Sequence, residues 1–209
     1  MDYIEQLINR YPVLNVNKNE IKAAFEIIAE SFGKGGKLLI AGNGGSAADA
    51  EHIAGELMKN FVKKRKLPGE FTAAMENVDT EISSYILPRL QPGLPVIALS
   101  ANVSLNTACI NDIDGNIAFA QQAYAYGKEE DVLLAISTSG NSKNVIYACA
   151  VAKAKNIKII GLTGTGGGKI KNFCDACICV PETETYKIQE LHMPVYHCLC
   201  LMLEEKFFN

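Results

Sequence analysis

The chain has 209 residues, of which 48% are hydrophobic and 21% charged, and its formal net charge is −3. This size and balance suit one globular α/β domain with at most a small appendage. The charge gives no bias toward nucleic acid, and no apolar run approaches the roughly 20 residues that a membrane-spanning helix needs. Seven cysteines, combined with an N-terminus that lacks an apolar signal core, predict reduced thiols and a cytoplasmic protein.

Two helices are predicted before the first strand, over residues 2–11 and about 18–33. The second has an apolar stripe at helical spacing, Asn17 is placed to cap it, and the glycines from Gly33 onward end it. A domain built on a single sheet does not require two helices before its first strand. The sequence therefore leaves two alternatives open, a helical arm that packs on a partner subunit or helices folded on their own domain.

The stretch from Leu38 to Glu56 combines a buried strand, a glycine turn and a helix. The apolar run 38–41 predicts the strand, and Ser46 is expected to cap the helix that follows. Unpaired backbone N–H groups at such a helix start form a ready site for an anion such as phosphate. His52 and Glu56 are four residues apart, so their side chains share one helix face beside this site. We interpret the stretch as half of an active site.

The next segment is the least readable. Lys63, Lys64, Arg65 and Lys66 form a basic run, for which a solvated loop is the first interpretation, attraction of an anionic sugar phosphate the second and nucleic acid binding the third. Across 69–93 acidic and apolar residues alternate, and prolines interrupt the pattern. Only a short helix near 79–87 is predicted there.

From residue 95 onward, apolar strands alternate with helices. Strands are predicted over 95–100, 131–136, 157–162 and 176–180, and helices over 104–110, 117–126, 143–155 and 185–207, with a turn-forming cluster at 111–115. With the first strand, this pattern predicts a three-layer, doubly wound α/β sandwich around a five-stranded parallel sheet. Ligands of such sheets bind at the carboxyl ends of the strands, where the turns 43–46 and 137–142 both lie.

The turn at 137–142 is the better phosphate cradle. It follows a strand, opens a helix and offers four hydroxyl groups, those of Ser137, Thr138, Ser139 and Ser142. A single hydroxyl would indicate an ordinary helix cap, whereas four in six residues favour phosphate binding.

Three other motifs carry less weight. Gly42-x-Gly44-x-x-Ala47 fits a dinucleotide fingerprint, but the acidic residue expected about twenty positions later is missing. The segment 164–169, GTGGGK, departs from a Walker loop at both ends. The cysteines at 174, 177 and 179 are interpreted as small apolar residues of a strand, because no second ligand pair follows at zinc-finger spacing.

The final predicted helix carries further candidate ligands. Gln189 and His197 are eight residues apart and lie on one side of the helix, although Pro194 predicts a kink between them. Together with His52 and Glu56 they form a nitrogen and oxygen donor set for a divalent metal, and two imidazoles favour zinc.

At these residues the chain resembles the sugar isomerase (SIS) family, and within it the phosphoheptose isomerases. The resemblance covers nearly the whole chain and rests on GNGGSAADAEHIAGEL, the Asn111-Asp112 pair, ISTSGNS and IQELHMPVYH. It implies isomerisation of sedoheptulose 7-phosphate to D-glycero-D-manno-heptose 7-phosphate, with Glu56 and His197 as acid–base residues. It also implies one zinc ion per subunit and a cytoplasmic homotetramer with active sites between subunits, acting on a phosphosugar without nucleic acid or membrane.

By the same resemblance, each functional residue has an expected role. The zinc ligands fall on His52, Glu56, Gln189 and His197. The substrate contacts fall on Asn43, Gly44, Gly45, Ser46, Glu56, Asn111, Asp112, Ser137, Thr138, Ser139, Ser142 and Gln189. Residues 1–35 are expected to form an N-terminal helical arm for oligomerisation, and residues 36–209 the SIS domain.

Two departures and one alternative accompany this hypothesis. The segment from about Phe61 to Pro95 is longer than is typical of the family, and Tyr186 stands where many members place a substrate-contacting aspartate. A related SIS group regulates replication initiation without catalysis and lacks the glutamate and the second histidine. This chain keeps Glu56 and His197, which favours an enzyme. The alternative is a non-catalytic phosphosugar-binding protein that regulates or assembles a partner.

Overall fold

The computed structural model describes residues 2–208, and a parallel sheet lies at its centre. Its strands are β1 (Leu38–Ala41), β2 (Val96–Ala98), β3 (Val132–Ile136), β4 (Lys158–Thr163) and β5 (Ala176–Cys179). They are arranged in the order β2-β1-β3-β4-β5, and all four pairings are parallel. Every residue of β1 and β3 is buried, which explains why both strands are continuous apolar runs rather than alternating ones.

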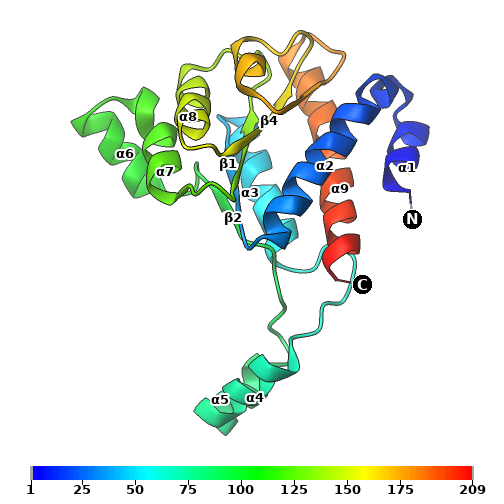
Figure 1. Cartoon of the computed structure of the whole chain (residues 1–209), viewed down its shortest axis with the longest axis vertical. Helices are drawn as coiled ribbons and strands as arrows, with labels where there is room; N and C mark the ends of the chain where they lie inside the picture. The colour runs from blue at the N-terminus through cyan, green and yellow to red at the C-terminus, as the bar shows by residue number, and fades with distance from the viewer. Residues whose placement is uncertain (1, 209) are drawn as a thin grey trace.

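Helices cover both faces of this sheet (Figure 1). The α-helices are α1 (Tyr3–Arg10), α2 (Lys18–Gly33), α3 (Gly45–Met58), α4 (Gly69–Val78), α5 (Thr80–Ile86), α6 (Val103–Asp112), α7 (Ala118–Tyr126), α8 (Lys143–Ala154) and α9 (Thr185–Phe207), and the 3-10 helices are η1 (Pro12–Asn17), η2 (Gly115–Ile117) and η3 (Lys169–Phe173). Leu38 and Ile40 face a core shared with α1, α2, α3 and α9, whereas Leu39 and Ala41 face a core shared with α7, α8 and η3. The predicted three-layer, doubly wound fold is therefore confirmed.

The first two helices pack against their own domain. Ile4 and Leu7 of α1 and Ile21 and Ile28 of α2 are buried in the core that also contains α9. The oligomerisation role of residues 1–35 stays a prediction. Within residues 2–208, no helix combines the length and the hydropathy that crossing a membrane requires.

Several local predictions are wrong. The cap of α3 is Gly44 rather than Ser46, because the helix already begins at Gly45 and Ser46 is buried in its first turn. Asn17 stands at the N-cap position of α2, but its side-chain oxygen accepts no N–H of the helix, and its amide donates to the carbonyl of Cys179. The helix α6 continues through Asp112, so the turn cluster starts later than expected.

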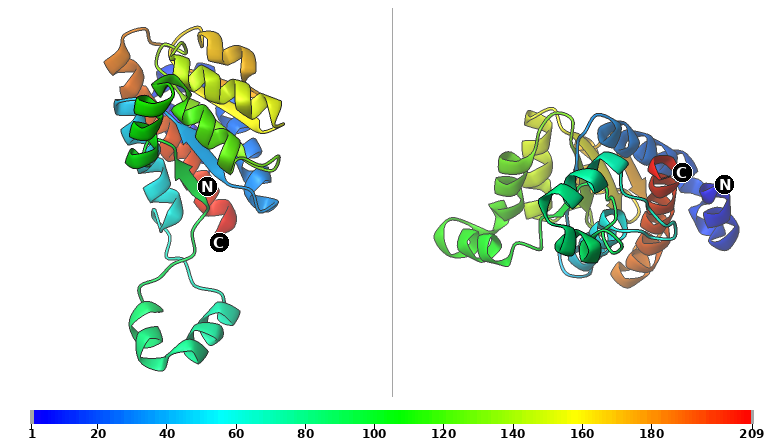
Figure 2. Two further views of the ribbon diagram at one scale, coloured as in Figure 1. Left: turned by 90° about the vertical axis from the view of Figure 1, so that its left-hand side faces the viewer. Right: turned by 90° about the horizontal axis from the view of Figure 1, so that it is seen from below.

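The segment after α3 forms a helical hairpin, α4 and α5, that projects from the body of the molecule (Figures 1 and 2). The predicted helix near 79–87 corresponds to α5, whereas α4 was not predicted. No residue of α4 is buried, because its apolar side chains have no sheet to cover. At the root of the hairpin, the backbone N–H of Asn60 donates to the side chain of Gln91, and the N–H of Leu94 donates to the carbonyl of Leu57.

Candidate active site

The turn between β1 and α3 has a backbone that only glycine adopts readily. Gly44 has φ 55° and ψ −120°, and a Cβ atom at Gly42 would lie 2.5 Å from the carbonyl oxygen of Ser46. The tight turn places the first N–H groups of α3 at the carboxyl edge of the sheet. The N–H groups of Ser46, Ala47 and Ala48 already donate to the carbonyls of Asn43 and Gly44. The turn therefore leaves the N–H groups of Gly44 and Gly45 as donors for an anion.

The turn between β3 and α8 lies beside it, because β1 and β3 are neighbours in the sheet. The side-chain amides of Asn43 and Asn144 join the two turns through reciprocal hydrogen bonds of 2.9 and 2.8 Å. In the second turn, the hydroxyl oxygens of Ser137 and Ser142 are 3.1 Å apart. The structure thus brings together the glycine turn and the hydroxyl-rich turn that the sequence singles out.

The glycine loop 164–168 packs against the hydroxyl-rich turn 137–142. Gly140 has φ 64°, and a Cβ atom there would lie 2.0 Å from the carbonyl oxygen of Gly167. The N–H of Gly164 donates to the carbonyl of Thr138. This loop therefore shapes the cradle.

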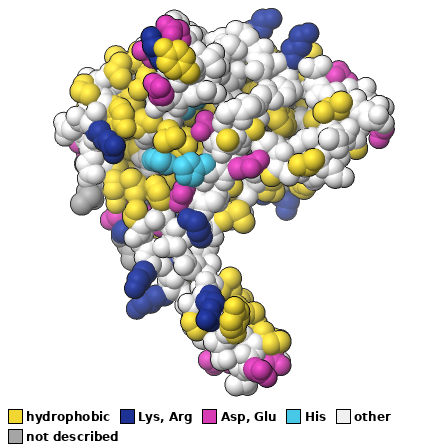
Figure 3. Space-filling model, turned by 180° about the vertical axis from the view of Figure 1, so that it is seen from behind, with side chains coloured by type: hydrophobic (Ala, Val, Ile, Leu, Met, Phe, Trp, Pro, Cys, Tyr) yellow, Lys and Arg dark blue, Asp and Glu magenta, His cyan; other side chains and the backbone are white. Residues whose placement is uncertain are grey.

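His52, Glu56 and His197 come together where α3 and α9 lie against each other. The Nε2 atom of His52 is 3.2 Å from Oε1 of Glu56, and the ring centroids of His52 and His197 are 5.1 Å apart in an edge-on arrangement. The side chain of His52 is 40% exposed, and Figure 3 shows a group of histidine side chains open at the surface above the projecting hairpin. The imidazole of His52 is accordingly accessible to a small ligand, and Glu56 and His197 lie behind it.

The environment of His197 favours a neutral ring. Burial lowers the pKa of His197, and the nearby His52 lowers it further, whereas Glu56 acts in the opposite direction. Its Nε2 atom is buried and has no hydrogen-bond partner. A neutral imidazole with an unused nitrogen is the form that binds a metal ion or accepts a proton.

Two residues beside this group were missed by the sequence analysis. Tyr196 is almost fully buried, and its hydroxyl group lies 3.0 Å from Nδ1 of His52 and donates to Oδ1 of Asp49 over 3.2 Å. Burial raises the pKa of Tyr196, and the Asp49 charge raises it further, so the phenol keeps its proton. Burial also raises the pKa of Asp49, although the bond from Tyr196 opposes this. The spacing of Asp49, His52 and Glu56 on α3 was a usable signal, but Tyr196 has none in the sequence.

Gln189 lies at the other end of the candidate site. Its side chain packs against the glycine turn, where a Cβ atom on Gly45 would lie 2.4 Å from its Nε2 atom. Eight helical residues separate Gln189 from His197, a rise of roughly 12 Å along α9. Gln189 thus borders the anion turn, and the structure shows no contact between its side chain and His52, Glu56 or His197.

Asn111 and Asp112 end α6 and are exposed, with the Asn111 amide donating to Asp112 over 2.7 Å. The neighbouring Ile110 lines a cavity of ≈ 220 Å³ together with Asn43 and Asn144. This end of α6 therefore faces the same edge of the sheet as the two turns, on the side away from the histidines.

The donor set fits a zinc ion in its chemistry. It offers the imidazoles of His52 and His197, one of which has an unused buried nitrogen, next to the carboxylate of Glu56. Among residues 2–208, no three histidine, cysteine, aspartate or glutamate side chains already stand in a metal-holding arrangement. Burial raises the pKa of Cys149 and Cys198 to about 12 and keeps both as thiols.

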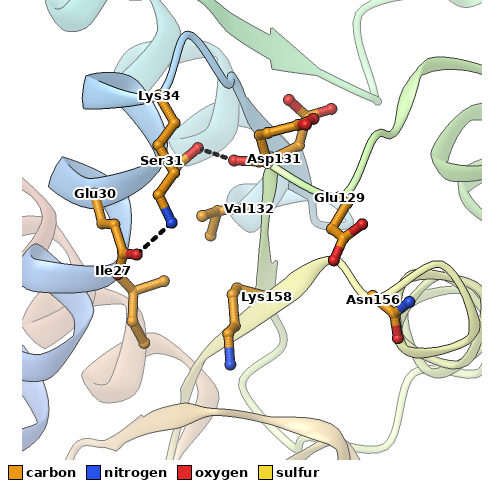
Figure 4. Close-up of a pocket in the computed structure, with 10 residues that line it drawn as sticks. Ile27, Glu30, Ser31, Lys34, Glu129, Asp131, Val132, Asn156 and Lys158 are labelled. Carbon is orange, nitrogen blue, oxygen red and sulfur yellow. Dashed lines mark hydrogen bonds and ion pairs between the residues drawn. The ribbon is translucent and has the colours of Figure 1, made fainter.

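A second cavity, of ≈ 200 Å³, lies at the opposite end of the strands, near the starts of β3 and β4 (Figure 4). Several of its charged side chains have partners. Lys34 pairs with Glu30, and the buried Asp131 binds Lys37. These ion pairs are typical of a solvated surface. The cavity therefore gives no reason to move the candidate site from the carboxyl edge of the sheet.

Known proteins are similar to this chain in sequence and in fold. The sequence profile of the SIS domain matches residues 2–87 and 73–164. A phosphoheptose isomerase of Rhodospirillum rubrum is 40% identical over 88% of this chain and 85% of its own length. One from Aneurinibacillus thermoaerophilus is 42% identical over 86% of this chain and 78% of its own.

Solved structures agree. A phosphoheptose isomerase from Neisseria gonorrhoeae superimposes with a TM-score of 0.75 at 31% identity, over 96% of this chain and 94% of that one. One from Francisella tularensis gives a TM-score of 0.77 at 31% identity, over 97% and 95%.

The fold and the site define the class, an α/β protein with an anion cradle at the carboxyl edge of a parallel sheet, next to an imidazole and carboxylate group. The chain belongs to the SIS domain family, in the group whose relatives are named phosphoheptose isomerases.

Proposed function

We propose that this protein is an aldose–ketose isomerase that converts sedoheptulose 7-phosphate to D-glycero-D-manno-heptose 7-phosphate. One observation carries the proposal: His52, Glu56 and His197 are gathered beside two joined turns suited to a phosphate group. Relatives and solved structures named phosphoheptose isomerase, covering most of the chain, support the substrate class.

In this proposal the phosphate is bound at the turn 137–142. The hydroxyl groups of Ser137, Thr138, Ser139 and Ser142 and the first N–H groups of α8 hold its oxygens. Backbone amides of Asn43, Gly44 and Gly45, with Ser46 behind them, border the sugar chain. Asn111 and Asp112 bind hydroxyl groups of the sugar from the end of α6.

Proton transfer is assigned to Glu56, with His197 as its partner. Aldose–ketose isomerisation moves one proton between the first two carbons of the sugar through an enediolate, and a single carboxylate can take and return it. Glu56 is only 16% exposed, and its two carboxylate oxygens lie 3.2 Å from Nε2 of His52 and 3.2 Å from Nζ of Lys59. The neutral His197 then exchanges a proton with the sugar oxygens.

The proposal includes one zinc ion per subunit, held by His52, Glu56, Gln189 and His197. When bound, zinc supplies Lewis-acid polarisation of the sugar carbonyl and offsets developing negative charge. Glu56 and His197 are assigned both as ligands and as acid–base groups, and the two roles compete. We further propose a cytoplasmic homotetramer in which neighbouring subunits complete each site, with residues 1–35 as part of the contact.

The second candidate is a phosphosugar-binding regulator that does not turn its ligand over. Retention of both Glu56 and His197 argues against it. The deciding experiment incubates the protein and zinc with sedoheptulose 7-phosphate and follows the sugar by NMR. New anomeric signals of the aldose that disappear in Glu56→Gln support the isomerase, whereas binding without turnover supports the regulator.

A further inference from the structure

The hydroxyl group of Tyr196 is held between a carboxylate and an imidazole. It lies 3.2 Å from Oδ1 of Asp49 and 3.0 Å from Nδ1 of His52. Tyr196 is 1% exposed, so water does not replace either partner. The Asp49 carboxylate and the His52 ring both come from α3, whereas Tyr196 reaches them from α9. Neither Asp49 nor Tyr196 has been given a role in the proposed reaction.

The number of protons on these groups fixes their directions. A carboxylate only accepts hydrogen bonds, so the single O–H of Tyr196 points at Asp49. The phenol oxygen then has only a lone pair to offer His52, and Nδ1 of His52 must carry the ring proton. A neutral imidazole protonated at Nδ1 has its lone pair on Nε2.

That lone pair faces another one. Nε2 of His52 is 3.2 Å from Oε1 of Glu56, and when the ring is neutral and the carboxylate is ionised no proton lies between them. Two acceptors facing each other at this distance are stabilised by a cation that both can bind. The tautomer that Tyr196 and Asp49 impose at Nδ1 therefore leaves the Nε2 atom of His52 ready to bind a metal ion.

We propose that Asp49 and Tyr196 are positioning residues that lock His52 in its Nδ1-protonated form and so aim its Nε2 lone pair at the zinc position. This inference rests on the proposed function for the identity of the metal, and on the hydrogen bonds alone for the tautomer. Replacing a group that hydrogen-bonds to a metal-binding histidine commonly lowers metal affinity 10- to 100-fold.

The test uses the full chain with Tyr196→Phe and Asp49→Ala, and with Tyr147→Phe as the matched control, since Tyr147 is an exposed tyrosine on α8. Two quantities are measured. Zinc affinity is obtained by competition with a chromophoric chelator, and the His52 tautomer of the metal-free protein by long-range ¹⁵N–¹H NMR. With three histidines in the chain, single replacements assign the signals.

We expect Tyr196→Phe and Asp49→Ala to lose the pure Nδ1–H pattern of His52 and to bind zinc 10- to 100-fold more weakly, with Tyr147→Phe unchanged. Asp49→Asn should restore the pattern, because its carbonyl oxygen still accepts from the phenol. A wild-type His52 protonated at Nε2, or variants that keep both the tautomer and the affinity within twofold, would overturn the positioning role. If the wild type shows the Nδ1–H pattern but binds no zinc, the metal proposal fails and the positioning of His52 stands.

Discussion

Arg65 and Glu204 form an ion pair that is closed to solvent. Their side chains are 0% and 1% exposed, and Nη2 of Arg65 is 3.0 Å from Oε1 of Glu204. The carboxylate also accepts the N–H groups of Phe61, Val62 and Lys63. Burial alone would raise the pKa of Glu204, but these N–H groups and Arg65 outweigh it and hold the pKa below its ordinary value. The pair fastens the root of the α4–α5 hairpin to the end of α9.

Breaking this pair should destabilise the protein strongly. Glu204→Gln leaves the Arg65 charge buried without a counter-ion, so we expect a loss of about 3–5 kcal/mol in the free energy of unfolding, measured by urea denaturation. The neighbouring Glu205→Gln is the control, because Glu205 pairs with Lys63 at the surface and should stay close to wild type. Equal losses in both variants would contradict the assigned importance of the buried pair.

The glycine at the start of α3 should matter for the site rather than for the fold. Gly45→Ala introduces a Cβ atom 2.4 Å from the present position of the Gln189 amide, which must move away. We expect kcat/KM for the phosphosugar to fall at least about tenfold, an effect of the size that misplaced groups produce. Gly55→Ala is the control on the same helix, since a Cβ atom there meets nothing within 4 Å. If both variants retain activity, Gln189 is not needed in its present place.

The hydroxyl-rich turn should act on substrate binding. Ser137→Ala and Ser142→Ala each remove one donor to the phosphate, and a hydrogen bond to a charged group contributes about 1.5–3 kcal/mol. KM should therefore rise roughly 10- to 100-fold with a much smaller change in kcat. Ser84→Ala on α5 is the control, because Ser84 bonds only a carbonyl within its own helix. A fall in kcat with unchanged KM would place the phosphate elsewhere.

His192 should make stability depend on pH. The ring is fully buried, both its nitrogens lack hydrogen-bond partners, and burial lowers its pKa from 6.5 to about 4. The unfolded chain takes up the proton first as the pH falls, so stability is complete above pH ~6.5 and declines from there down to pH ~4. Between pH 8 and pH 5 the loss from this group is about 2 kcal/mol.

Urea denaturation at these two pH values checks this. His192→Leu should flatten the decline, whereas the same replacement at the half-exposed His52 should leave most of it. An unchanged pH slope in His192→Leu would show that other groups cause it.

The sheet could be predicted from the sequence because each strand is marked by its own short run of apolar residues. Each strand is an apolar run buried on both faces, and each loop between strands holds a helix, so a parallel order follows from 38–41, 131–136 and 157–162. The sequence also predicted that the turns near Asn43 and Ser137 lie at the same edge of the sheet, whereas their side-by-side position comes from the pairing of β1 with β3 in the structure. The His52 and Glu56 pair followed from helical spacing.

The sequence could not predict contacts between side chains that are far apart along the chain. Asn17 is a residue type that caps helices, but its amide is held by the carbonyl of Cys179 and its side-chain oxygen receives no N–H of α2. Tyr196 has the periodicity of a core residue, and only the packing of α9 on α3 places its hydroxyl between Asp49 and His52. The helix α4 was missed even though Phe71, Ala74, Met75 and Val78 recur at helical spacing, and no core of this chain covers that stripe.

The construction of the α4–α5 hairpin has an evolutionary consequence. Its two ends are fastened to each other, by Asn60 to Gln91 and by Leu57 to Leu94, so the distance that the chain must bridge without the hairpin is short. The SIS domain profile matches this chain in two stretches, and these overlap at residues 73–87, within the hairpin. Because its ends already meet, the hairpin can change in length without displacing the strands and turns of the candidate site, so such a change alters the outline of the molecule more than its chemistry.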